Sequence, residues 1–159
     1  MSSRPTHVLF LCTGNSARSI LSEALLNDLG TGRFKAFSAG SQPSGVPHPD
    51  GLAELRKRGH NTDGYRSKSW DEFAKEGAPD MDIVVTVCDS AAAETCPVFF
   101  GPGMRVHWPA PDPAHIEDEA ERVQAFADVY DLCRARIEAL SALPADSLPD
   151  RKTVQQIAD

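Results

Sequence analysis

Short apolar runs alternate along the chain with longer stretches in which apolar residues recur every three or four positions. His7–Leu11 is nearly continuous in apolar residues, and Met81–Val87 is rich in β-branched ones. Such runs are typical of strands that are buried on both faces of a parallel sheet. Phe34–Ala39 and Arg105–Trp108 are two further strand candidates. The pattern therefore predicts four strands.

The longer stretches have the periodicity of amphipathic helices. In Ile20–Leu29 the apolar residues fall at helical spacing, and Gly30 ends the segment. Pro49–Arg58 and a short segment that follows Ser69, its candidate N-cap, are also predicted to be helical. From Ile116 to about Leu143 the apolar positions step by three and four residues, which predicts one long helix; they are Val123, Phe126, Tyr130, Cys133, Ile137 and Leu140.

Strands and helices in this order predict an α/β fold, a single-domain three-layer sandwich with a four-stranded parallel sheet flanked by helices. Residues 1–143 are expected to form this domain. Residues 144–159 are mostly polar and contain two prolines, so we expect a loosely ordered C-terminal tail there. The segment Cys88–Gly103 has no clear periodicity and is interpreted as a mobile loop.

Composition narrows the class of protein. The 159 residues carry a formal net charge of −7, which argues against a nucleic-acid partner and against adhesion to an anionic membrane. No apolar run is long enough to cross a bilayer, and the first residues, Met1–Thr6, lack the apolar core of a signal peptide. We therefore expect a cytoplasmic protein.

The chain has four cysteines, and a reducing compartment disfavours structural disulfides between them. They form no CxxC pair, and the five histidines show no ligand spacing, so no metal site and no cofactor are predicted. Cys133 falls on the apolar stripe of the last long helix and is expected to be a buried, inert thiol. Reactive thiols remain the interpretation for the other three.

The segment Cys12–Ser19, with the sequence C-T-G-N-S-A-R-S, joins the first strand to the first helix. At such a junction successive backbone N–H groups can form a cradle for a tetrahedral oxyanion. Arg18 adds a planar two-pronged donor and, with the helix N-terminus, favours the thiolate of Cys12. The alternative is a structural cysteine beside a surface arginine. The predicted oxyanion-binding residues are Thr13, Gly14, Asn15, Ser16, Ala17, Arg18 and Ser19.

Two more reactive groups are expected at the same edge of the sheet. Cys12 and Cys88 each end a predicted strand, and Asp112 follows the last strand. The carboxyl ends of parallel strands are where such folds bind ligands. Simpler interpretations remain open: Cys88 as a small core residue, Cys96 as an incidental loop cysteine, and Asp112 as a turn former.

The Cys12–Ser19 segment resembles the phosphate-binding loop of low-molecular-weight phosphotyrosine phosphatases and of their arsenate-reductase relatives. Further motifs are similar to the thioredoxin-coupled arsenate reductases: Thr86-Val87-Cys88-Asp89, Thr95-Cys96-Pro97, His107-Trp108 and Asp112-Pro113. This resemblance implies that Cys12 forms a thiol–arsenate adduct held by Arg18, and that Asp112 protonates the departing oxygen. Cys88 then displaces arsenite, and Cys96 carries the disulfide outward.

The implied substrate is arsenate, with phosphate or sulfate as competing oxyanions. The implied electron donor is thioredoxin. Glutaredoxin with glutathione is the second candidate, because the Cys88–Cys96 spacing is slightly longer than in the thioredoxin-coupled type. The main alternative is a phosphotyrosine phosphatase that works through a phosphocysteine at Cys12. Ser41–Pro49 offers no aromatic wall for phosphotyrosine, however. A third interpretation is a noncatalytic oxyanion- or partner-binding protein.

One branch of these reductases binds a potassium ion beside the loop. Asn15 and Ser38 match two of its ligand positions, whereas Arg66 and Lys68 fall at the other two. We therefore predict that the ammonium group of Lys68 takes the place of the cation, and that turnover does not depend on potassium.

Overall fold

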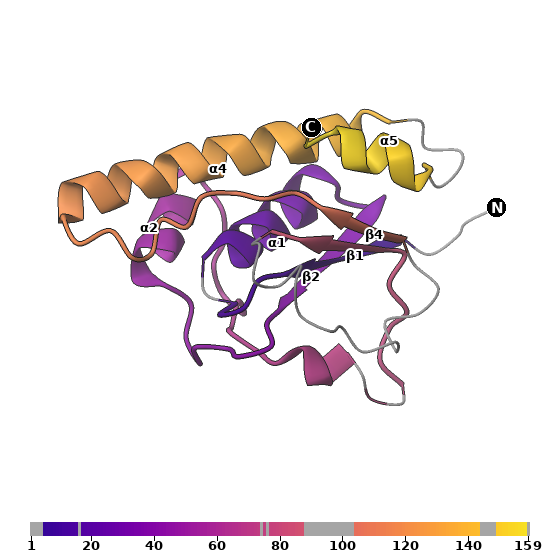
Figure 1. Ribbon diagram of the computed structural model, residues 1–159, viewed down its shortest axis with the longest axis horizontal. Helices are drawn as coiled ribbons and strands as arrows, with labels where there is room; N and C mark the ends of the chain where they lie inside the picture. Colours follow the sequence, from indigo (N-terminus) through magenta and orange to yellow (C-terminus); the bar gives the residue numbers. More distant parts are fainter. Residues whose placement is uncertain are drawn as a thin grey trace.

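The computed structural model describes residues 5–15, 17–73, 75, 77–87, 104–143 and 149–158. Its centre is a parallel sheet with the strand order β2-β1-β3-β4 (Figure 1). The two central strands are buried along most of their length, as their apolar sequences predict. The strands are β1 (Thr6–Leu11), β2 (Phe34–Ala39), β3 (Ile83–Thr86) and β4 (Met104–His107).

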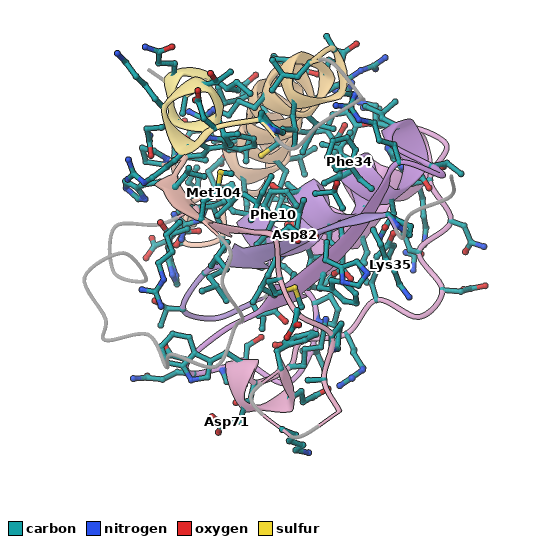
Figure 2. The ribbon with its side chains drawn as sticks, turned by 90° about the vertical axis from the view of Figure 1, so that its right-hand side faces the viewer. Phe10, Phe34, Lys35, Asp71, Asp82 and Met104 are labelled. Carbon is teal, nitrogen blue, oxygen red and sulfur yellow. The ribbon has the colours of Figure 1, made fainter. Side chains whose placement is uncertain are left out.

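Helices cover one face of this sheet, and a second, smaller apolar layer covers the other. Val8 and Phe10 pack into the main core, whereas Leu9 and Leu11 pack with Phe73 on the opposite face. This alternation follows from the period of two along a strand. In Figure 2, Phe10 lies between the sheet and the long helices, and the short 3₁₀ turn lies on the far side. The helices are α1 (Arg18–Leu29), α2 (Pro49–Lys57), α4 (Glu119–Ser141), α5 (Arg151–Gln156) and the 3₁₀ helix η1 (Trp70–Phe73).

This arrangement confirms the predicted fold class. Helix α1 packs against β1 and β2 on one side and against α4 on the other (Figure 1). Because β1 runs directly into α1, the residues between them lie at the carboxyl edge of the sheet. The segments that follow β3 and β4 leave the same edge, which brings three separate parts of the chain to one place.

The C-terminal residues differ from the loosely ordered tail that the sequence suggested. Residues 149–158 include helix α5, which packs on β4, while 144–148 and 159 lie outside the described residues. The indole Nε1 of Trp108 donates to the carbonyl of Val154 at 3.0 Å. The amide of Gln155 pairs with both backbone groups of His107, at 2.8 and 2.7 Å. The side chain of Gln155 therefore continues the hydrogen bonding at the β4 edge, where no other strand of the described residues pairs.

We expect Gln155→Ala to lower the free energy of unfolding by about 1–2 kcal/mol, because two hydrogen bonds to a partly buried strand edge are lost. Thermal denaturation followed by circular dichroism measures this loss. Gln156→Ala is the matched control, since Gln156 is an exposed neighbour on the same helix. Equal melting temperatures for both variants and the wild type would show that α5 does not contribute through Gln155.

Candidate active site

The loop between β1 and α1 begins at a buried cysteine and ends at the first residue of a helix. Cys12 is 5% exposed, and Arg18 opens α1 with Ala17 as its N-cap residue. Alanine has no side-chain acceptor, so Ala17 does not cap the first turn of α1. The N–H groups at a helix N-terminus are suited to binding an anion. Ser16, one of the predicted loop residues, lies outside the described part of the chain.

The carbonyl groups of the loop are bonded to neighbouring segments. The carbonyl of Thr13 accepts from the backbone N–H of Gln42 at 3.0 Å. The carbonyl of Gly14 accepts from the N–H of Ser44 at 2.9 Å and from the hydroxyl of Ser67 at 3.1 Å. With these carbonyls held by other segments, the loop can direct its N–H groups toward a bound anion.

Gly40 allows β2 to end directly against this loop. A Cβ atom at Gly40 would lie 2.4 Å from the carbonyl oxygen of Thr13 and 2.6 Å from that of Cys12. Any side chain here would displace the loop, because both close contacts are with backbone atoms. The contact of Gly40 with Thr13 depends on how β2 pairs with β1, so the sequence alone does not indicate it.

Arg18 is oriented by the segment that follows β4. Its Nη1 donates to the carbonyl of Ala110 at 3.0 Å, and its Nη2 lies 3.5 Å from Oδ2 of Asp112. The side chain is 13% exposed, and its Nε is buried with no hydrogen-bond partner among the described residues. A buried donor without a partner is costly unless a ligand completes it. Arg18 therefore has a donor available for an oxyanion.

Asp112 combines a turn with contact to the site. Its Oδ1 accepts from the backbone N–H of Ala114 at 2.9 Å, the turn role that the sequence left open. Its Oδ2 faces Arg18, and it also lies 3.2 Å from Nε2 of the exposed His115. The structure thus places Asp112 beside Arg18 while its backbone turn fixes the direction of the carboxylate.

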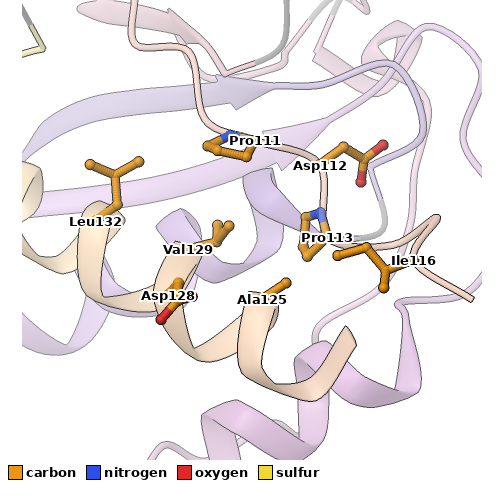
Figure 3. A pocket seen from close by; sticks show the side chains of 8 residues that line it. All are labelled: Pro111, Asp112, Pro113, Ile116, Ala125, Asp128, Val129 and Leu132. Carbon is orange, nitrogen blue, oxygen red and sulfur yellow. The ribbon is translucent and has the colours of Figure 1, made fainter. Parts of the chain in front are cut away.

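An apolar pocket of about 320 Å³ lies between the Asp112 loop and α4 (Figure 3). Pro111 and Pro113 line it from the loop, and Val129 and Leu132 line it from α4. In Figure 3 the carboxylate of Asp112 points away from these α4 side chains. The pocket therefore lies behind the acid, and the oxyanion would bind on the other side of the loop, near Arg18.

The predictions for Cys88, Cys96 and Cys133 differ in how far the structure bears on them. Cys88 and Cys96 lie outside the described residues, as does the rest of the segment 88–103. Cys133 is 4% exposed in the main core, and burial raises the pKa of its thiol. That environment fits the expected inert thiol. Among the residues that the structure describes, no group of three His, Cys, Asp or Glu side chains is placed to hold a metal ion.

A buried pair of opposite charges lies beside the loop. Lys68 Nζ is 3.8 Å from Oε1 of Glu23 and 3.5 Å from Oγ of Ser38. Ser38 and Lys68 were predicted from the sequence, whereas Glu23 was not. The available signal was a carboxylate within the otherwise apolar face of Ile20–Leu29, since α1 is buried from Ser19 to Leu26.

Known proteins resemble this chain over most of its length. A family model described as low molecular weight phosphotyrosine protein phosphatase matches residues 7–151. An arsenate reductase of Halalkalibacterium halodurans is 32% identical over 84% of this chain and 94% of its own length. A glutaredoxin arsenate reductase of Synechocystis is 27% identical over 85% and 95%. The thioredoxin-dependent arsenate reductase of Corynebacterium glutamicum aligns with a TM-score of 0.63 at 26% identity, over 88% of this chain and 62% of that one.

Proposed function

Since this chain belongs to the low molecular weight phosphotyrosine protein phosphatase family, we propose that it is an arsenate reductase with Cys12 as the attacking thiolate. The observation that carries the proposal is the convergence at one sheet edge of Cys12, the N-terminus of α1, and Arg18 beside Asp112. Relatives that match most of the chain are named arsenate reductases, which supports arsenate as the substrate.

In the first step, arsenate binds to the N–H groups of the loop and to Arg18. The thiolate of Cys12 attacks arsenic, and a sulfur–arsenic bond replaces an arsenic–oxygen bond. Asp112 gives a proton to the departing oxygen, which leaves as water. The loop and Arg18 hold the remaining negative oxygens throughout. The 3.5 Å separation of Arg18 Nη2 and Asp112 Oδ2 supports this role, because the oxyanion would bind to the same arginine.

In the second step, the thiolate of Cys88 attacks the sulfur of Cys12. The sulfur–arsenic electron pair stays on arsenic, which is thereby reduced from As(V) to As(III) and leaves as arsenite. Cys96 then attacks Cys88 and frees Cys12, and an external dithiol protein reduces the Cys88–Cys96 disulfide. The attack of Cys96 on Cys88 and the final external reduction are thiol–disulfide exchange. Each internal disulfide requires Cα atoms within about 7 Å of one another.

Thioredoxin is the proposed electron donor, and glutaredoxin with glutathione is the second candidate. Relatives of both kinds match this chain. We also propose that the protein acts in the cytoplasm, where such dithiol donors are kept reduced. None of the helices that the structure describes is both long and apolar enough to cross a membrane.

The second candidate function is phosphotyrosine hydrolysis, which the name of the matching family favours and which would use the same Cys12, Arg18 and Asp112. We expect the wild-type protein to reduce arsenate at least tenfold more efficiently, in kcat/KM, than it hydrolyses an aryl phosphate. Phosphate and sulfate should inhibit competitively, because they have the same tetrahedral shape. The reverse ratio, with efficient aryl phosphate hydrolysis and no arsenite, would favour the phosphatase.

We predict that arsenate reduction proceeds equally well in sodium and potassium buffers. Lys68 Nζ already lies among Ser38 Oγ, Glu23 Oε1 and the carbonyl of Arg66, so a positive charge is built into this position. Steady-state rates at matched ionic strength measure the effect. A large stimulation by potassium would contradict the prediction.

A further inference from the structure

A buried ion pair outside the catalytic groups supports the Cys12 loop from behind. Glu23 lies on α1 and Lys68 lies just before η1, and their side chains are 11% and 8% exposed. Lys68 Nζ is 3.8 Å from Glu23 Oε1, and the hydroxyl of Ser38 donates to the same oxygen at 2.5 Å. The two charges therefore join three elements, α1, β2 and the segment before η1, in the interior of the protein.

Each charge of this pair depends on the other. Burial raises the pKa of Glu23, and the nearby charge of Lys68 opposes that shift. Burial also lowers the pKa of Lys68, and Glu23 opposes that shift in turn. Removing one partner of such a pair leaves an uncompensated charge in the interior, which is strongly unfavourable. The pair is therefore expected to hold its segments together as a unit.

The segment that carries Lys68 is bonded directly to the loop. The backbone N–H of Lys68 donates to Oδ1 of Asn15 at 2.8 Å. The hydroxyl of the preceding residue, Ser67, donates to the carbonyl of Gly14 at 3.1 Å. On its other side, the carbonyl of Lys68 accepts from the N–H of Gly40 at 3.0 Å. A shift of Lys68 would therefore move the contacts of two consecutive loop residues.

Asn15 connects this segment to Ser19 through a side-chain hydrogen bond. Asn15 has a φ of 44°, a left-handed conformation that a residue with a side chain adopts at a cost. Its Nδ2 donates to the hydroxyl oxygen of Ser19 at 2.9 Å. Because that oxygen accepts from Asn15, the hydroxyl hydrogen of Ser19 is left to donate elsewhere, and the Cys12 thiolate is its proposed acceptor.

We propose that Lys68 and Glu23 are positioning residues for Cys12. Their ion pair holds residues 66–68 against the loop, and the loop in turn keeps Asn15 and Ser19 in the geometry needed for oxyanion binding and thiolate attack. This inference rests on the proposed function, which names arsenate as the substrate. Oxyanion binding at Cys12 depends on the same positioning and can be measured without arsenate reduction.

The test is the variant Lys68→Ala, which leaves the carboxylate of Glu23 beside a space of lysine size. We expect kcat/KM for arsenate to fall about 10- to 100-fold, as for other small misplacements in an active site. Methylammonium chloride should restore most of this loss, because its cation fits beside Glu23. Lys57→Ala is the control, because Lys57 is exposed on α2. This variant should keep the wild-type kcat/KM, and methylammonium should not change it.

A second readout uses inorganic phosphate as the probe. Iodoacetamide alkylation of Cys12, followed by peptide mass spectrometry, measures how strongly phosphate protects the thiol. Protection should weaken in Lys68→Ala and return with methylammonium. If the wild type forms no arsenite but these protection changes occur, the proposed function fails and the positioning role stands.

The variant Glu23→Gln keeps the shape of the side chain and tests the pair if Lys68→Ala does not fold. We expect it to lose kcat/KM and phosphate protection about tenfold or more, with no response to methylammonium, since no anion remains to bind it. Wild-type kcat/KM and protection in either folded variant would overturn the proposal. A loss in folded Lys68→Ala that methylammonium does not reverse would overturn it as well.

Discussion

We expect Cys88→Ser and Cys96→Ser each to stop the protein after at most one equivalent of oxidation, whereas the wild type should turn over many times. Without Cys96, Cys12 and Cys88 should still form their disulfide and release one arsenite, but no thiol would then free Cys12. Without Cys88, no internal thiol would attack the adduct at Cys12. The loss is large because thiol–disulfide exchange requires a sulfur in reach of its partner.

Arsenite formed per enzyme, in the presence of thioredoxin, thioredoxin reductase and NADPH, measures this arrest. Mass spectrometry of Cys96→Ser should show a disulfide between Cys12 and Cys88. Cys133→Ala is the matched control, because Cys133 is a buried core thiol and its variant should continue to turn over. Sustained turnover by both serine variants would exclude the three-thiol cascade.

Arg18→Lys should lower kcat/KM for arsenate by about 100- to 1000-fold, which corresponds to roughly 3–4 kcal/mol of transition-state stabilisation. Lysine keeps the charge but cannot reproduce the planar two-pronged donor. Arg18 donates to the carbonyl of Ala110 through Nη1, and its Nε, which has no partner among the described residues, can donate to the oxyanion. A lysine has one nitrogen and cannot reach both acceptors from separate atoms. The effect should appear in both kcat and KM, because Arg18 holds the oxygens before and during attack.

Steady-state kinetics of Arg18→Lys, alongside Arg33→Lys, checks this expectation. Arg33 precedes β2, at the opposite end of that strand from Gly40, and its Nη1 donates to the carbonyl of Ser141. Its replacement should leave kcat/KM near the wild-type value. An Arg18→Lys variant with wild-type kcat/KM would show that the oxyanion is bound elsewhere.

The elements that depend on local pattern were predictable. The second predicted strand, Phe34–Ala39, coincides with β2, and the long predicted helix contains α4. The start of α4 is set by Asp118, whose carboxylate accepts from the N–H of Glu121 at 2.9 Å, a cap that periodicity alone did not locate. Helix α5 was missed because Val154 is its one buried apolar residue, and its packing partners Trp108 and His107 lie far back in the sequence.

The same distinction holds for the candidate site. Cys12 to Ser19 is one contiguous segment between a strand and a helix, so its oxyanion-binding chemistry can be predicted from the sequence. Gly40 and Glu23 act through contacts between distant segments. Glu23 meets Lys68 because the segment before η1 returns to the sheet edge, and no periodicity in the sequence marks that meeting. Such contacts depend on the tertiary structure and are not encoded in any local sequence pattern.

The most direct test of the central claim is arsenite production by the wild type and by Cys12→Ser, with thioredoxin, thioredoxin reductase and NADPH. We predict repeated turnover by the wild type, with one NADPH consumed per arsenite, and no arsenite from Cys12→Ser. A wild type that forms no arsenite while it hydrolyses aryl phosphates, or a Cys12→Ser variant that still reduces arsenate, would contradict the proposal.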